Sequence, residues 1–137
     1  MAGAYFADTF YWIALTHRQD TWHSRAAAWA NAHPSGRLVT TEEVLSELLT
    51  WFAGSGPAGR ASAADAVRQI VSDPAVHVLP QTSADFHAAL ALYESRLDKD
   101  YSLVDCRSMV ALRALGILEV LTNDHHFTQE GFTILFP

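Results

Sequence analysis

The sequence predicts an α/β protein, a three-layer α/β/α sandwich around a central parallel sheet of four to five strands. Short apolar runs alternate along the chain with longer segments of helical periodicity. The short runs are apolar throughout, which is typical of strands that helices cover on both faces. A length of 137 residues fits a single domain, residues 1–137, that is large enough to bury such a sheet.

The first part of the chain is predicted to form a strand, two helices and a second strand. Residues 4–8, Ala-Tyr-Phe-Ala-Asp, form a short buried strand that ends on an acid. Residues 9–17 follow as a short helix, and the Asp-Thr pair at the junction suits its N-cap. Residues 21–33 are rich in Ala and Trp and form a helix that stops before a Pro-Ser-Gly turn. Residues 37–41 form the second strand.

Two consecutive helices are expected before the third strand. Residues 42–53 place an apolar stripe on one helical face. The stripe consists of Val44, Leu45, Leu48, Leu49 and Phe52. The Gly-rich segment 54–59 breaks this helix, and residues 58–72 form the next one, which ends at an Asp-Pro pair. Residues 76–79 form the third strand.

The last part of the chain returns to the sheet twice. Residues 83–97 carry apolar side chains at helical spacing. Residues 102–115 form a helix with Ser102 as its N-cap and a glycine as its stop. Residues 118–122 and 132–136 form the last strands, on either side of a short helical turn. Right-handed crossovers then bring the carboxyl ends of these parallel strands to one edge of the sheet, where ligands bind.

Four acids are candidates for a site at that edge. Asp8 ends the first strand, Asp124 follows the strand before the last, and Asp105 lies in the first turn of its helix. Glu47 lies in the middle of a helix, beside its apolar face. Each acid alone has an ordinary explanation, respectively a helix cap, a turn residue, a capping-box acid and a solvated helix face. Their combination is what indicates a site.

The segments around these acids resemble the PIN-domain nucleases, in particular the VapC-type toxins of bacterial toxin–antitoxin pairs. The opening segment Asp-Thr-Phe-Tyr-Trp-Ile-Ala-Leu begins at Asp8, and the second motif, Thr-Thr-Glu-Glu-Val-Leu-Ser-Glu, ends at Glu47. The third motif is Tyr-Ser-Leu-Val-Asp-Cys around Asp105, and the fourth is Leu-Thr-Asn-Asp-His-His-Phe around Asp124. The third and fourth motifs are the specific ones. The resemblance covers essentially the whole chain and implies the same PIN-like fold.

This resemblance implies Mg²⁺- or Mn²⁺-dependent hydrolysis of RNA, with products that carry a 5′-phosphate and a 3′-hydroxyl. It implies that Asp8, Asp105 and Asp124 hold the metal or its waters, and that Glu47 is a further ligand or positions the attacking water. The residue types agree, because Mg²⁺ prefers oxygen ligands. A cation also relieves the repulsion between clustered carboxylates. Whether Glu43, Asp98 or Asp100 adds an outer carboxylate stays open.

Neighbouring polar residues are candidates for substrate binding. These are Thr122, Asn123, His125 and Arg107. His126 is expected to be structural, because a His-His pair without further ligands does not make a zinc site. Five basic residues are considered for an RNA path near the sheet edge. They are Arg18, Arg96, Lys99, Arg107 and Arg113.

The overall charge neither requires nor excludes a phosphate substrate. Fifteen acids against nine bases give a net charge of −6, which disfavours non-specific binding to nucleic acid. However, acids that share one metal site account for much of this charge, and eight of the nine bases are Arg, which suits phosphate contacts. The single cysteine, Cys106, excludes an internal disulfide and is expected to be packed in the core.

Compartment and partners follow from composition and from the resemblance. We expect an intracellular, cytoplasmic protein, because no apolar run is long enough to span a membrane and the N-terminus does not resemble a signal peptide. The resemblance implies an RNA substrate, a cognate antitoxin that blocks the acidic site, and a homodimer. The alternatives are a PIN-fold RNA-processing nuclease outside a toxin pair and a catalytically inactive binding module. A receiver-like signalling domain is disfavoured, because Asp8 has no acidic neighbour after its strand.

Overall fold

The computed structural model describes residues 3–137. Five parallel strands form one sheet with the order β3-β2-β1-β4-β5, which confirms the predicted fold class. The strands are β1 (Ala4–Ala7), β2 (Arg37–Thr41), β3 (Val76–Leu79), β4 (Glu119–Leu121) and β5 (Thr133–Ile134).

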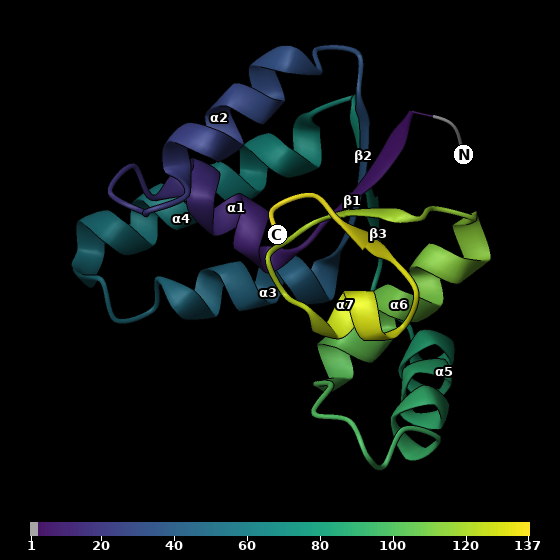
Figure 1. The fold of residues 1–137 in the computed structure, drawn as a ribbon. Coiled ribbons are helices and arrows are strands. Elements are labelled where there is room, and N and C mark those ends of the chain that lie inside the picture. Colours follow the sequence, from purple (N-terminus) through teal and green to yellow (C-terminus); the bar gives the residue numbers. More distant parts are fainter. Residues whose placement is uncertain (1–2) are drawn as a thin grey trace.

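Seven helices among the described residues connect the strands and cover both faces of the sheet. They are α1 (Thr9–Thr16), α2 (His23–Ala32), α3 (Glu42–Trp51), α4 (Gly56–Ser72), α5 (Ser83–Glu94), α6 (Leu103–Leu115) and α7 (His126–Gln129). Figure 1 shows α1, α2 and α4 on one side of the sheet and α5 and α6 on the other. This arrangement is the predicted three-layer sandwich. Right-handed crossovers produce it because the chain adds β2 and β3 on one side of β1 and then β4 and β5 on the other side.

The register of the two central strands places the candidate site. Phe6 pairs with Val120 and Ala7 pairs with Leu121, and all four side chains are fully buried. The residues that follow these strands therefore emerge side by side at the same edge. The strand order also reverses here, because β1 leads on to β2 on one side and β4 leads on to β5 on the other. Such a reversal opens a crevice at the carboxyl ends of the strands.

Four helix boundaries differ from the prediction by two or three residues. Helix α2 begins at His23 rather than at residue 21, and helix α3 ends at Trp51, two residues earlier than expected. Helix α4 begins at Gly56, within the segment predicted to be a break, because Pro57 occupies its first turn, where the fixed φ of proline favours a helix. Helix α5 ends at Glu94, three residues earlier than expected. The chain turns away there, and Arg96 extends to an ion pair with Glu130 at the end of α7.

The capping of α6 matches the prediction in detail. The Ser102 hydroxyl accepts a hydrogen bond from the Asp105 N–H, and the Asp105 carboxylate accepts one from the Ser102 N–H, each at 3.0 Å. Gly116 ends the helix with a φ of 67°, a left-handed conformation that suits glycine. Cys106 is free and fully buried, as predicted. Among the described residues, no helix is long and apolar enough to cross a membrane.

Glu130 joins the loop after α5 to the ends of α6 and α7. Its side chain is only 4% exposed and accepts hydrogen bonds from Arg96, Arg113 and Tyr101. Burial alone raises the pKa of Glu130, but these three hydrogen bonds more than offset that effect and lower the pKa below its ordinary value.

Replacing Glu130 with Gln is expected to lower the free energy of unfolding by about 1–3 kcal/mol, because two arginines lose their common carboxylate. Urea unfolding followed by circular dichroism measures this loss. Glu94→Gln, on the exposed end of α5, is the matched control and should change stability little. Equal stability of Glu130→Gln and Glu94→Gln would contradict the anchoring role.

Candidate functional site

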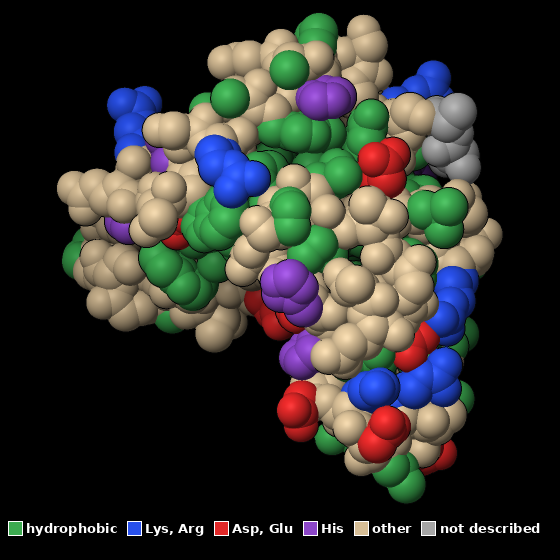
Figure 2. Space-filling model, in the orientation of Figure 1, with side chains coloured by type: hydrophobic (Ala, Val, Ile, Leu, Met, Phe, Trp, Pro, Cys, Tyr) green, Lys and Arg blue, Asp and Glu red, His purple; other side chains and the backbone are tan. Residues whose placement is uncertain are grey.

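The four predicted acids line one cleft at the carboxyl edge of the sheet. The cleft has a volume of about 830 Å³, and its walls include Asp8, Glu47, Asp105 and Asp124. In Figure 2, acidic and histidine side chains gather at the notch in the lower edge of this face, and hydrophobic side chains border the notch on its left. The acids come from the end of β1, from α3, from the first turn of α6 and from the loop after β4.

Asp8 is the most buried of the four acids. It stands at the N-cap of α1, as the sequence predicted, but its side chain makes no capping hydrogen bond. Its carboxylate instead accepts a hydrogen bond of 2.9 Å from the hydroxyl of Thr122. Burial raises the pKa of Asp8 to about 7, and the nearby carboxylates of Asp105 and Glu47 add to this rise. A cation bound beside such a buried carboxylate would stabilise its ionised form.

Glu47 faces the same cleft from α3. Its carboxylate accepts a short hydrogen bond from the hydroxyl of Thr9, at the start of α1. Burial raises the pKa of Glu47, and repulsion from Asp105 and Asp124 raises it further. Glu43 lies one turn earlier and also lines the cleft, but its Oε2 accepts a hydrogen bond of 2.9 Å from Arg107. Of the two α3 acids that line the cleft, Glu47 is therefore the one without a basic partner among the described residues.

Asp105 combines a structural position with a place in the cleft. Its capping box with Ser102 fixes the carboxylate at the start of α6. Burial raises the pKa of Asp105 and the charge of Asp124 raises it further, although the hydrogen bonds from Ser102 act in the opposite direction. Asp105 is thus the capping-box acid of α6 and also lines the cleft.

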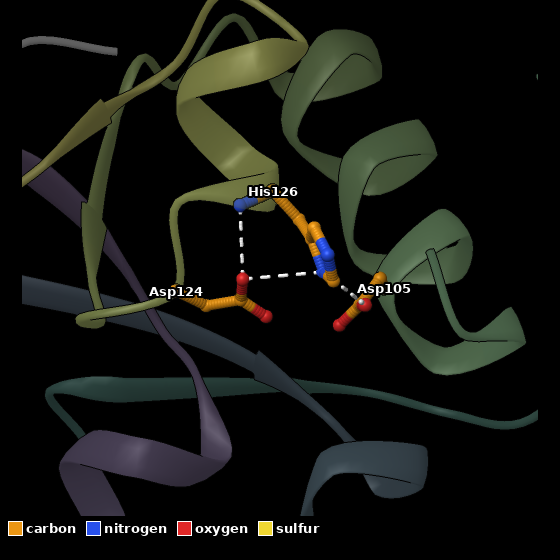
Figure 3. Close-up of side chains that lie close together, drawn as sticks. All are labelled: Asp105, Asp124 and His126. Carbon is orange, nitrogen blue, oxygen red and sulfur yellow. Dashed lines mark hydrogen bonds and ion pairs between the residues drawn. The ribbon is translucent and has the colours of Figure 1, made fainter. Parts of the chain in front are cut away.

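Asp124 is held by its own loop and lies next to His126. Its N–H donates to the Thr122 hydroxyl at 3.1 Å, and its Oδ1 accepts from the His126 N–H at 2.9 Å. Figure 3 shows the His126 ring between the carboxylates of Asp105 and Asp124. The ring Nδ1 lies 3.5 Å from Asp105 Oδ2 and 3.2 Å from Asp124 Oδ1, yet it is buried and makes no hydrogen bond. The sequence prediction that His126 is only structural missed this placement.

The donor set fits a divalent cation. One ligand atom each from Asp105, Asp124 and His126 lies within 4.8 Å of the others. Three carboxyl groups in the cleft have raised pKa values that arise partly from mutual repulsion. Carboxylate oxygens suit Mg²⁺ and Mn²⁺, and an imidazole nitrogen is a better ligand for a transition metal than for Mg²⁺. The site therefore has the charge and the ligand types that such an ion requires.

The residues predicted to bind substrate differ in how accessible their side chains are to a ligand. Thr122 is fully buried and holds Asp8 and Asp124 in position. The Asn123 side chain donates to the backbone carbonyl of Phe136, and only the exposed His125 is free to meet a ligand from solvent. The structure therefore gives Thr122 and Asn123 mainly a supporting role.

Arg107 does not reach the cleft, contrary to the substrate contact suggested for it. Its side chain is only 5% exposed and forms ion pairs with Glu43 at 2.9 Å and Asp85 at 3.3 Å. It also donates to the carbonyl of Pro80. A guanidinium buried in this way supports α3 and α5 and is not available to bind a phosphate.

Most of the other bases considered for an RNA path are also engaged. Arg96 and Arg113 share Glu130, and Lys99 pairs with Asp98. Arg18 lines a different groove, beside α2 and α4. Two acids left open by the sequence, Asp98 and Asp100, are exposed and lie outside the set of residues that line the cleft. They lie on the segment between α5 and α6.

Comparison with known proteins identifies a protein family whose sequences match this chain. The PIN domain family model matches residues 5–132. The chain is 30% identical over 135 residues to the 23S rRNA-specific endonuclease VapC20 of Mycobacterium tuberculosis, in both strain CDC 1551 / Oshkosh and strain ATCC 25618 / H37Rv. The aligned region covers 96% of this chain and 98% of the relative.

Solved structures agree with this match. The crystal structure of Mycobacterium tuberculosis VapC20, described as a sarcin–ricin loop cleaving toxin, superposes with a TM-score of 0.83 at 26% sequence identity. The match covers 94% of this chain and 96% of that one. VapBC2 from Rickettsia felis, bound to a DNA fragment from its promoter, gives a TM-score of 0.61 at 12% identity over 96% of each chain, which is a likeness of fold.

Proposed function

Because this chain belongs to the PIN-domain family, we propose that it is a divalent-metal-dependent endoribonuclease and the toxin of a toxin–antitoxin pair. The observation that carries the proposal is the convergence of four acids, from four separate segments, in one cleft at the reversal point of the sheet. Carboxylates that are buried together without basic partners destabilise a fold unless they bind a cation. A site of this kind suits phosphodiester hydrolysis.

We assign the metal to Asp8, Asp105 and Asp124, which line the same cleft, and His126, beside Asp105 and Asp124, is a further candidate ligand. When bound, Mg²⁺ or Mn²⁺ lowers the pKa of a coordinated water and stabilises charge on a leaving oxygen. Glu47 is held by Thr9, next to Asp8 in the chain, and it either completes the ligand set or accepts a proton from the attacking water. Thr122 orients two of the acids, so it acts as a positioning residue.

We propose an RNA substrate, cut to leave a 5′-phosphate and a 3′-hydroxyl. The relative VapC20 is named as specific for 23S rRNA and for the sarcin–ricin loop, which makes structured ribosomal RNA the first substrate to test. A cognate antitoxin that covers the cleft, a homodimer and a cytoplasmic location are parts of the same proposal. They are supported by the family resemblance.

Cleavage of RNA by the purified protein tests the proposal. Ribosomes, protein-free 23S rRNA and a transcript of the sarcin–ricin loop are incubated with Mg²⁺, with Mn²⁺ and with EDTA, and the cut site is mapped by primer extension. We expect a discrete cut that requires the metal and is suppressed by EDTA. Cleavage that persists in EDTA would contradict a metal-dependent mechanism.

The two glutamates of α3 that line the cleft provide a separate prediction. Glu47→Gln is expected to lower kcat by about 100-fold or more without lowering the melting temperature, because it removes a carboxylate from the cleft. Glu43→Gln is expected to keep activity within about 10-fold but to lower stability by about 1–3 kcal/mol, because it removes a charged partner of the buried Arg107. If only Glu43→Gln abolishes cleavage, the assignment of Glu47 is wrong.

A further inference from the structure

A second, smaller pocket lies beside the acidic cleft. It has a volume of about 340 Å³ and lies between the N-terminal part of α5 and the first turns of α6. Glu43, Gln81 and Val104 line both the pocket and the cleft, so the two are adjacent. Val104 directly precedes Asp105, which places the pocket next to a proposed metal ligand.

The pocket has apolar walls and a polar rim. Its apolar side chains are Phe86, Ala89, Leu103 and Val104. Gln81, Thr82 and Ser83 stand at the rim and are exposed. The Phe86 ring is 49% exposed although it lines a cavity, so the core does not account for its placement. A flat, partly polar group fits such a pocket better than an aliphatic one.

The charges in the pocket disfavour a phosphate as its occupant. Arg107 also lines the pocket, but its guanidinium is already paired with the carboxylates of Glu43 and Asp85. Two negative groups thus face a single positive one, and a phosphate would meet net negative charge. An uncharged ligand with hydrogen-bonding edges avoids this cost.

We propose that this pocket binds a nucleobase of the RNA next to the phosphate that is cut, with the base stacked on Phe86. The inference rests on the proposed function and adds a recognition subsite to it. The base leaves the RNA stack and enters the pocket, and its edge meets the polar groups of Gln81, Thr82 and Ser83. Base–aromatic stacking tolerates any base, so affinity comes mainly from Phe86 and discrimination from the rim.

The test compares two exposed aromatic residues of the same helix. Phe86 is 49% exposed and Tyr93 is 48% exposed, but Tyr93 does not line this pocket. Phe86→Ala is expected to raise KM by about 5- to 100-fold. The Kd should rise by the same factor when it is measured in EDTA with a fluorescein-labelled RNA hairpin that the wild-type protein cuts. The kcat at saturating RNA should stay within about 3-fold. Phe86→Trp should retain affinity, whereas Phe86→Leu should lose it, because leucine preserves apolar bulk without a ring.

Tyr93→Ala serves as the matched control and should leave KM, Kd and kcat unchanged. Equal KM and Kd for Phe86→Ala and wild type would overturn the base pocket while leaving the nuclease proposal intact. An equal loss in Tyr93→Ala would also overturn it, since the effect would then not be specific to the pocket. If the wild-type protein neither cuts nor binds RNA, the proposed function itself fails and the base pocket fails with it.

Discussion

Replacing Asp105 with Asn is expected to lower kcat for RNA cleavage on the order of 10³-fold, because it removes a charged ligand from the centre of the acidic cleft. The variant should fold normally. An asparagine oxygen still accepts the hydrogen bond from the Ser102 N–H, and the Asp105 N–H still donates to the Ser102 hydroxyl, so the start of α6 is preserved. Single-turnover cleavage at saturating Mn²⁺ measures the loss in the chemical step.

Asp98→Asn is the matched control for Asp105→Asn. Asp98 is exposed and pairs only with Lys99 among the described residues, so its replacement should leave kcat unchanged. Cleavage by Asp105→Asn at near wild-type rate would remove Asp105 from the catalytic machinery.

Asp8→Asn is expected to stabilise the metal-free protein at pH 8 while abolishing metal-dependent cleavage. Burial raises the pKa of Asp8 from 3.8 to about 7, so ionised Asp8 destabilises the folded state. This cost is absent below about pH 4, where Asp8 is protonated in both states. It grows as the unfolded state ionises, and it is complete above about pH 7. The neutral asparagine removes the cost, a gain of roughly 1–4 kcal/mol at pH 8 that should vanish toward pH 4.

Thermal unfolding in EDTA at a series of pH values measures this gain. Asp65→Asn, on the exposed surface of α4, is the control and should show no such pH dependence. Excess Mn²⁺ should then stabilise the wild type at pH 8 more than it stabilises Asp8→Asn, since the variant lacks one of the proposed ligands. A variant that is less stable than the wild type at pH 8 in EDTA would argue against charge repulsion in the cleft.

The local order of residues was enough to predict the sheet and the four acids. Asp8 and Asp124 follow strands and Asp105 opens a helix, and parallel pairing of β1 with β4 brings the ends of these two strands together. Glu47, in the middle of α3, was identified from its motif. Helix α6 was also predictable, because Ser102, Asp105 and Gly116 mark its ends through bonds to residues nearby in the chain. Helix-capping patterns can be recognised from the sequence because the residues that form them are only a few positions apart.

Features that depend on contacts between distant segments were not predictable. Arg107 pairs with Glu43, 64 residues away in the chain, so no pattern near Arg107 shows that its charge is already satisfied. The end of α5 depends on the ion pair between Arg96 and Glu130. The position of His126 beside Asp105 requires α6 and α7 to pack together. One local signal for His126 was present, since an Asp two residues earlier favours a turn that brings the two side chains together.

Calorimetric titration of Mn²⁺ into the metal-free protein tests the central claim most directly, because it does not depend on finding the right RNA. The wild type is predicted to bind Mn²⁺ at the acidic cleft, and Asp105→Asn is predicted to bind it at least about 100-fold more weakly without a loss of thermal stability. Asp98→Asn should bind as the wild type does. Mn²⁺ binding that is absent in the wild type, or that is unchanged in Asp105→Asn, would contradict the assignment of this cleft as a metal-dependent nuclease site.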